Sequence, residues 1–152
     1  MVLVAAVLLS GCDNLWDVAN RGSARSDVAA LLRQHGTPSA APDCHMVGRS
    51  RDVVCRLSAS AAEVSQLVRA LSLISVERSE TPTTALQHLA ARKEPQCELA
   101  ANFGRDPEVK LFGVAGRPPQ LRLPNDTAFS HLLLYHHAAS GRACLELSYS
   151  YG

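Results

Sequence analysis

The chain has 152 residues, a formal net charge of +1 and 19% charged residues. Its hydrophobic content of 47% is typical of a globular domain and excludes global disorder. The charges form no long basic or acidic block, so the sequence gives no support for nucleic-acid binding. We therefore expect one folded domain of ordinary charge, with no nucleic acid among its partners.

An apolar segment, residues 2–9, stands near the start and is followed by Ser10, Gly11 and Cys12. It is too short for a membrane-spanning helix, which needs roughly 20 apolar residues. It fits the apolar region of a secretory signal, which has roughly 7–15 such residues before a small-residue cleavage site. The alternative is a buried strand with Cys12 as a core thiol. We favour the signal, because an apolar segment that ends in two small residues and a cysteine is an uncommon coincidence.

The end of this segment, Leu9-Ser10-Gly11-Cys12, resembles the lipobox of bacterial lipoproteins. In that family the cysteine thiol takes a diacylglycerol, the chain is cleaved just before it, and the new amino group is acylated, often with palmitate. The resemblance implies a signal peptide at 1–11, lipid attachment at Cys12 and a lipidated tether at 12–25. Two or more acyl chains give stable anchoring.

The residues on either side of the lipobox-like segment also bear on the predicted lipid anchor. No Lys or Arg precedes the apolar segment, which departs from the usual signal pattern. Asp13 follows the cysteine and resembles the retention signal of inner-membrane lipoproteins, which slightly favours the inner over the outer membrane. The resemblance therefore implies a protein anchored in the bacterial cell envelope and facing the periplasm.

The four cysteines after Cys12 indicate disulfide bonds, because an exported chain folds in an oxidising compartment and an even number of cysteines can pair completely. Four cysteines allow three pairings. The chain has no C-x-x-C and no paired histidine motif, so we expect no zinc, and we expect no other cofactor. We favour pairing Cys44 with Cys55 and Cys97 with Cys144.

The first pairing follows from a predicted hairpin. Residues 44–47 and 53–57 have strand character, and polar turn residues centred on Arg49 and Ser50 separate them. That register places the first two of the four cysteines directly opposite each other, close enough for a bridge at a non-hydrogen-bonded pair.

Helix caps and apolar spacing predict three short helices. The clearest begins with Ser60 and Glu63, which have the spacing of a capping box. Residues 73–76 form either a strand after this helix or its last turn. The other helices begin at Ser26 or Asp27 and at Thr83 or Thr84, and end at Gly36 and before Pro95.

The second half of the chain has strand character. Leu132, Leu133 and Leu134 are consecutive, so their strand should be central and covered on both faces. Overall we predict an α+β domain over 26–152, in which two or three short helices pack on one face of a mainly antiparallel sheet. The expected strands are 96–103, 108–114, 129–137 and 143–151, with a short edge strand at 120–123.

Histidine gives the only candidate chemistry. His131, Tyr135 and His137 should share one face of a strand, where they could bind a metal or carry acid–base chemistry. We favour an ordinary polar strand end, because no carboxylate is placed in the sequence to orient the imidazoles. The chain also contains no nucleophile elbow, P-loop or dinucleotide fingerprint, so we assign no catalytic residue.

These features together predict a non-catalytic protein-interaction module, held to the membrane by its lipid and bound to another envelope protein. An inhibitor or immunity protein against an envelope enzyme is one concrete form. The alternative is a small-ligand or metal-binding envelope module, with His131 and His137 as weak metal candidates, and a hydrolase is less favoured.

Overall fold

The structure is a computed structural model that describes residues 26, 30–35, 42–46, 52–92, 97–116 and 127–151. For 46, 127–130 and 149–151 it describes the backbone alone. The lipobox-like segment with Cys12, the tether and the expected edge strand at 120–123 lie outside these ranges.

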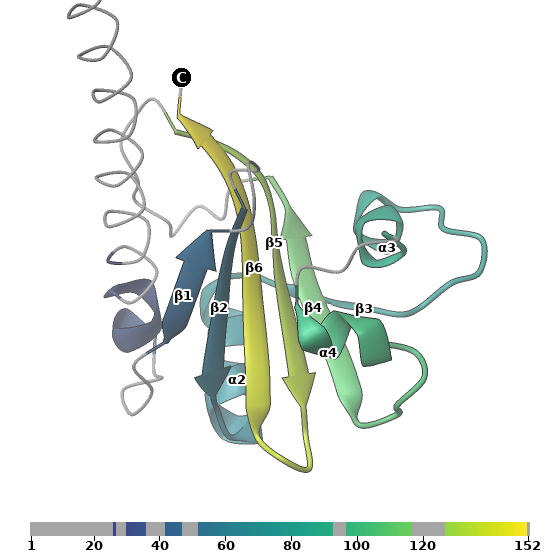
Figure 1. Ribbon diagram of the computed structural model, residues 1–152, viewed down its shortest axis with the longest axis horizontal. Helices are drawn as coiled ribbons and strands as arrows, with labels where there is room; N and C mark the ends of the chain where they lie inside the picture. Colours follow the sequence, from purple (N-terminus) through teal and green to yellow (C-terminus); the bar gives the residue numbers. More distant parts are fainter. Residues whose placement is uncertain are drawn as a thin grey trace, which may run out of the picture.

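The described chain builds a six-stranded antiparallel sheet with the strand order β1-β2-β6-β5-β4-β3 (Figure 1). This architecture confirms the predicted α+β class and antiparallel sheet. No described helix is long and apolar enough to cross a membrane. The strands are β1 (Asp43–Met46), β2 (Asp52–Ser58), β3 (Ile74–Val76), β4 (Val109–Ala115), β5 (Thr127–His137) and β6 (Arg142–Tyr151), and the helices are α2 (Ala61–Ala70), α3 (Ala85–Ala90) and α4 (Glu98–Asn102).

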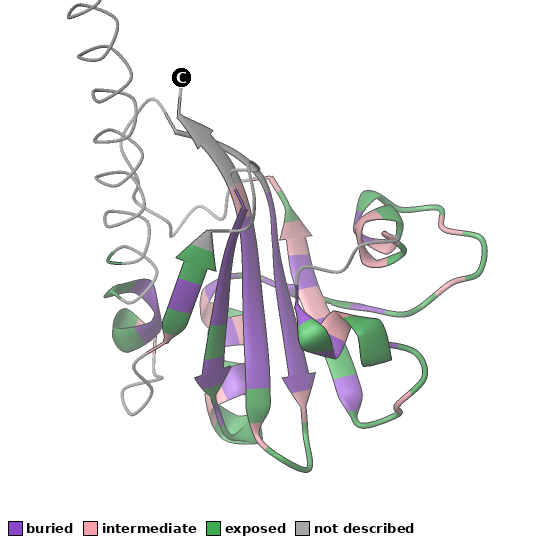
Figure 2. Ribbon diagram, viewed as in Figure 1, coloured by how far each residue is buried: buried purple, intermediate pink, exposed green. Residues whose placement is uncertain are grey.

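The two longest strands, β5 and β6, pair with each other in the interior of the sheet. Successive side chains of a strand point to opposite faces. Leu132 and Leu134 belong to one hydrophobic core and Leu133 to the other, and each is at most 1% exposed. The central strands are accordingly buried along most of their described length (Figure 2), as the three consecutive leucines predict.

Helices cover both faces of the sheet, whereas the sequence led us to expect them on one. Leu67 of α2 packs in the core with Leu132, together with Leu31 and Leu32 from a helical segment at 30–34. Leu86 of α3 and Leu99 of α4 belong to the other core. In Figure 1, α2 lies behind the sheet and α4 in front of it. Both faces need cover because β5 is apolar on both.

The strand predicted at 96–103 is wrong, because this segment forms α4. Leu99 and Phe103 are four residues apart and both buried, at 2% and 8% exposure. That spacing places them on one face of a helix. The residues between them include two alanines, which favour helix.

Both expected disulfides are present. Cys44 of β1 lies opposite Cys55 of β2 in the strand register, with their Cα atoms 4.0 Å apart. Cys97, at the start of α4, bonds to Cys144 of β6 across 6.3 Å between Cα atoms. The second bridge therefore fixes the helical layer to the centre of the sheet.

The caps of α2 and α3 also follow the sequence. In α2 the Ser60 hydroxyl accepts the Glu63 N–H at 3.2 Å, and the Glu63 carboxylate accepts the Ser60 N–H at 2.6 Å. Thr84, one of the two threonines considered, caps α3 in the same reciprocal way with Gln87. Residues 74–76 form the strand β3 and are not the last turn of the preceding helix, which were the two alternatives for this segment.

Candidate functional site

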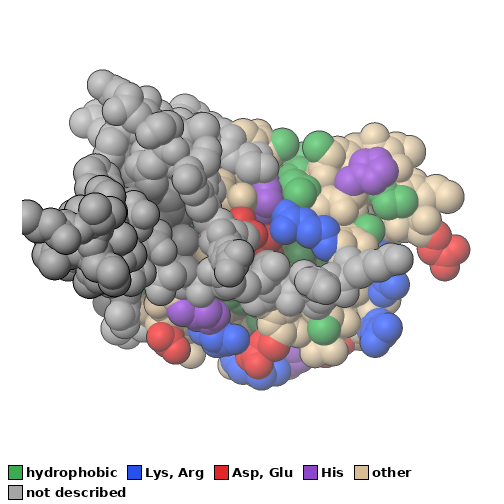
Figure 3. All heavy atoms as spheres, turned by 45° about the horizontal axis from the view of Figure 1, so that its top comes forward, with side chains coloured by type: hydrophobic (Ala, Val, Ile, Leu, Met, Phe, Trp, Pro, Cys, Tyr) green, Lys and Arg blue, Asp and Glu red, His purple; other side chains and the backbone are tan. Residues whose placement is uncertain are grey.

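A buried ionic cluster lies on the face of the sheet that α3 and α4 cover. Glu146 of β6 and His131 of β5 are only 3% and 2% exposed, whereas the Arg92 side chain, just beyond α3, is 31% exposed. Glu146 Oε1 lies 3.2 Å from Arg92 Nη1 and 3.3 Å from His131 Nε2. In Figure 3, basic, acidic and histidine side chains lie side by side near the centre of the view.

The cluster satisfies a carboxylate that would otherwise be buried without a partner. A buried charge must be paired or hydrogen-bonded to avoid a large desolvation penalty. His131 Nε2 also lies 2.9 Å from Arg92 Nη2. When unprotonated, this nitrogen accepts from Arg92, and when protonated it donates to Glu146. The three groups therefore have two alternative hydrogen-bonding arrangements.

Tyr135 lies on the same strand face and is 2% exposed. Its ring meets Phe103 edge-on, with the ring centroids 6.1 Å apart. Burial, and then the nearby Glu146 carboxylate, raise the pKa of Tyr135 well above its ordinary value of 10.0, while Arg92 opposes the shift. The hydroxyl is therefore neutral at physiological pH and can donate a hydrogen bond.

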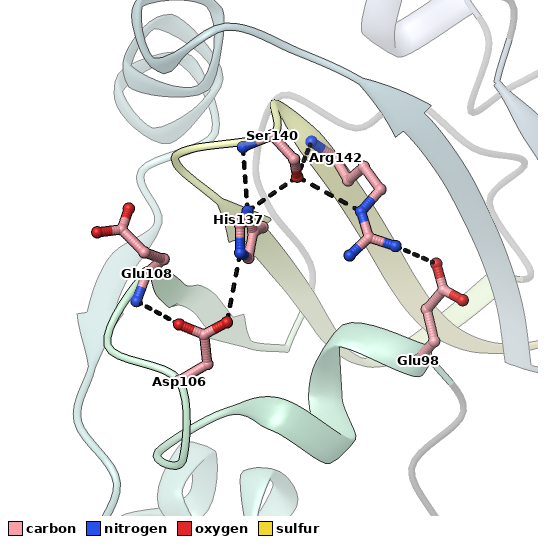
Figure 4. A network of polar contacts seen from close by, with 6 residues as sticks. All are labelled: Glu98, Asp106, Glu108, His137, Ser140 and Arg142. Carbon is pink, nitrogen blue, oxygen red and sulfur yellow. Dashed lines mark hydrogen bonds and ion pairs between the residues drawn. The ribbon is translucent and has the colours of Figure 1, made fainter.

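His137 belongs to a second polar network, at the turn between β5 and β6 (Figure 4). Its Nε2 lies 3.3 Å from Asp106 Oδ2. Its Nδ1 accepts from the backbone N–H of Ser140 at 3.1 Å and lies 2.8 Å from the Ser140 hydroxyl. That hydroxyl accepts from the Arg142 N–H at 3.3 Å, and Arg142 lies 3.5 Å from Glu98 of α4.

The order of carboxylate, imidazole and hydroxyl is that of a serine nucleophile with its base. Catalysis by such a unit also needs N–H donors aimed at a developing oxyanion. Here the N–H of Ser140 is bonded to the His137 ring, and the N–H of Gly141 is bonded to the His137 carbonyl at 3.0 Å. The network thus ties the hairpin to the loop before β4, and these two N–H groups already have partners within the hairpin.

The expectation that no carboxylate orients the histidines is wrong. Glu146 contacts His131, and Asp106 contacts His137. In the β5–β6 register, Glu146 lies opposite Leu133 and so diagonally from His131. Both contacts depend on strand pairing or loop position, which the spacing along the chain does not show.

The two histidines do not form one site. They are six residues apart on β5, and at about 3.3 Å per residue their backbones lie roughly 20 Å apart. His131 contacts Glu146 and Arg92, whereas His137 contacts Asp106 and Ser140. In the part of the chain that the structure describes, no group of three His, Cys, Asp or Glu residues is placed to hold a metal ion.

A groove of about 350 Å³ lies beside the last strand of the sheet, where sequence reasoning identified no site. Ile74 of β3 is 60% exposed and lines it. Gly113 of β4 lies opposite Ile74 in the register, and a side chain at Gly113 would come within 2.9 Å of Leu133. Further lining residues come from β3, the start of α3 and the end of β4, namely Ser75, Val76, Glu77, Thr84, Ala85, Leu86, Gln87, Val114 and Ala115.

No family model matches the chain, and no match was found among curated proteins or solved structures. Proposals about its role therefore rest on its own residues.

Proposed function

We propose that this protein is a membrane-anchored lipoprotein of the bacterial envelope, facing the periplasm and acting as a non-catalytic protein-interaction module. The lipobox-like Leu9-Ser10-Gly11-Cys12 supports the anchor, with Cys12 as the lipid attachment site. The two disulfides suit an oxidising compartment. Asp13 favours the inner membrane.

The interaction role rests on one observation, the free edge of β3. Among the described strands, β3 pairs with β4 alone and ends the sheet. An exposed sheet edge accepts an extended segment of a partner as a further strand, in which main-chain hydrogen bonds supply affinity and side-chain pockets supply specificity. The groove beside Ile74 offers such a pocket for an apolar side chain.

The edge of β3 is only partly protected against pairing with another chain, and this favours binding of a partner. Proteins commonly protect edge strands by keeping them short and by placing charges nearby. β3 has three residues and is followed by Glu77, which fits that pattern. Ile74 does not, because it is the one large hydrophobic side chain strongly exposed in the described chain. A single exposed apolar side chain is common on protein surfaces, so the interaction role depends on the place of Ile74 on the end strand of the sheet and beside the groove.

The tether and the disulfides suit an inhibitor or immunity protein that blocks an envelope enzyme. A domain fixed by two bridges loses little conformational entropy when it binds, which favours affinity. The lipid anchor would keep the domain at the surface where such an enzyme acts.

The test is affinity capture of the full chain from solubilised native membranes. Ile74→Asp places a charge in the groove, and Ala62→Asp places the same charge at an exposed position of α2, on the opposite face. We expect a stoichiometric envelope protein with the wild type and with Ala62→Asp, and its loss with Ile74→Asp at an unchanged urea midpoint. Recovery of no stoichiometric protein would contradict the interaction role, and equal recovery with all three chains would contradict the assignment to β3.

A further inference from the structure

A second hollow, about 520 Å³ in volume, lies between α3, α4 and the loop after β3. Small-molecule sites commonly occupy roughly 300–1,000 Å³. Its lining combines an apolar wall with charged groups. The wall consists of Ala90, Ala91, Ala100, Ala101 and Phe103, and the charged residues are Arg78, Arg92, Arg105 and Glu80.

Arg78 is held in place by its surroundings. Its Nη1 donates a hydrogen bond to the Phe103 carbonyl at 3.1 Å. Its aliphatic stem crosses Gly104, where any side chain would collide with the Cδ atom of Arg78. Gly104 has a φ of +78°, so glycine is favoured there by the backbone as well. Within the described ranges the guanidinium has no other hydrogen-bond partner, so its remaining N–H groups can bind a ligand.

The charge of the hollow is positive on balance. Arg92 is compensated by its contact with Glu146. Arg105 is exposed and forms no ion pair with the residues that the structure describes. Of the remaining lining residues, Arg78 and Arg105 are basic and Glu80 alone is acidic.

We propose that this hollow binds a small anionic molecule, whose carboxylate or phosphate group meets Arg105 and Arg78 and whose apolar part lies against the alanine wall. The planar guanidinium matches both anions through paired hydrogen bonds. This site goes beyond the interaction role, because Arg105 and Arg78 do not line the groove at Ile74. The anionic group could come from a soluble molecule or from a phospholipid headgroup.

The probe is phenylphosphate, with neutral phenol as its matched control, titrated calorimetrically into the full chain in a neutral detergent. We expect saturable binding of phenylphosphate and none of phenol. Arg105→Gln should weaken the affinity about tenfold, as the loss of a charge-assisted hydrogen bond does. Glu80→Gln should strengthen it, because it removes a repelling charge.

Arg69→Gln is the control for a general loss of positive charge, because Arg69 lies on α2 at the opposite face and should leave the affinity unchanged. Affinity should rise in Glu80→Gln and fall in Arg105→Gln. These opposite changes distinguish a ligand site from a structural effect, which would lower the affinity in both variants. Absence of saturable binding, or the same affinity in the wild type and Arg105→Gln, would overturn the proposal.

A competition arm identifies the source of the anion. Short-chain phosphatidylglycerol and diacylglycerol, which has the same acyl chains and no phosphate, are each added before phenylphosphate. Competition by phosphatidylglycerol alone supports the site with a phospholipid as its source, and competition by neither supports it with a soluble ligand. Equal competition by both lipids would show displacement by acyl chains and would overturn the role of the arginines.

Discussion

Glu146 links elements that are distant in the sequence, because its carboxylate meets Arg92 from beyond α3 and His131 from β5. The same carboxylate adds to the effect of burial in raising the pKa of Tyr135. One buried acid therefore pairs with Arg92 and His131 and contributes to the raised pKa of Tyr135.

Replacing Glu146 with Gln should destabilise the fold by about 2–3 kcal/mol. Breaking a fully buried ion pair costs roughly 3–5 kcal/mol, and the partial exposure of Arg92 reduces that figure. The control is Glu98→Gln, since the Glu98–Arg142 pair is 56% exposed on both sides and should be worth less than about 1 kcal/mol. Urea unfolding measures both, and equal losses would contradict a dominant role for the buried cluster.

Tyr135 gives a prediction about alkaline pH. Its folded-state pKa lies above the ordinary 10.0, so the native state holds a proton that the unfolded chain releases above that pH. Stability should therefore fall as pH rises above 10.0. Tyr135→Phe should flatten this fall in urea midpoints measured between roughly pH 8 and 11. An unchanged slope in the variant would show that another group is responsible.

At the scale of the elements, sequence patterns within a few residues predicted the helix caps and strands that depend on neighbouring residues. The capping box at Ser60, the pairing of β1 with β2 and the strand with the consecutive leucines of β5 all follow from local patterns, and the structure has each of them. α4 was mistaken for a strand, because five helical residues carry little periodicity. Its helical form depends on burial of Leu99 and Phe103 beneath a bridged Cys97.

Sequence reasoning about the candidate sites failed where contacts join distant segments. The neighbours of Glu146, the groove at Ile74 and the hollow near Arg105 all require the order of the strands. That order is set by packing of the whole sheet and leaves no spacing signal. Only the alternation of β6, combined with the β5–β6 register, could have placed Glu146 near His131.

Gly104, in the turn after α4, and Gly116, just beyond β4, offer a matched pair of glycine substitutions. Gly104 and Gly116 both have positive φ, +78° and +83°, but only Gly104 would place a new methyl group against Arg78. Gly116→Ala should cost about 1 kcal/mol for the backbone alone. Gly104→Ala should cost about 1 kcal/mol more, since Arg78 must move. Equal losses in thermal unfolding would mean that Arg78 is not held by this contact.

At the scale of the whole molecule, the sheet separates two differently used faces. α2 packs on one face. On the other face, α3 borders both the groove at β3 and the positive hollow, and α4 borders the hollow. The Cys97–Cys144 bridge holds α4 against β6. The positive hollow therefore lies next to a helix that a covalent bond keeps in place.

Loss of that bridge should cost more than loss of the other. The cysteines of the Cys97–Cys144 pair are 47 positions apart, against 11 for Cys44–Cys55. The chain-entropy account gives a difference of about 1 kcal/mol in favour of the longer loop. Paired Cys→Ser variants of each bridge, compared by urea unfolding, measure it. A larger loss from the Cys44–Cys55 pair would contradict this ranking.

Mass spectrometry of the protein purified from its native membrane, intact and after non-reducing digestion, tests the proposed lipid-anchored identity most directly. We predict a chain that begins at a lipidated Cys12 and contains the Cys44–Cys55 and Cys97–Cys144 bridges. An unprocessed Met1 with free thiols would contradict the lipid anchor and the oxidising compartment together.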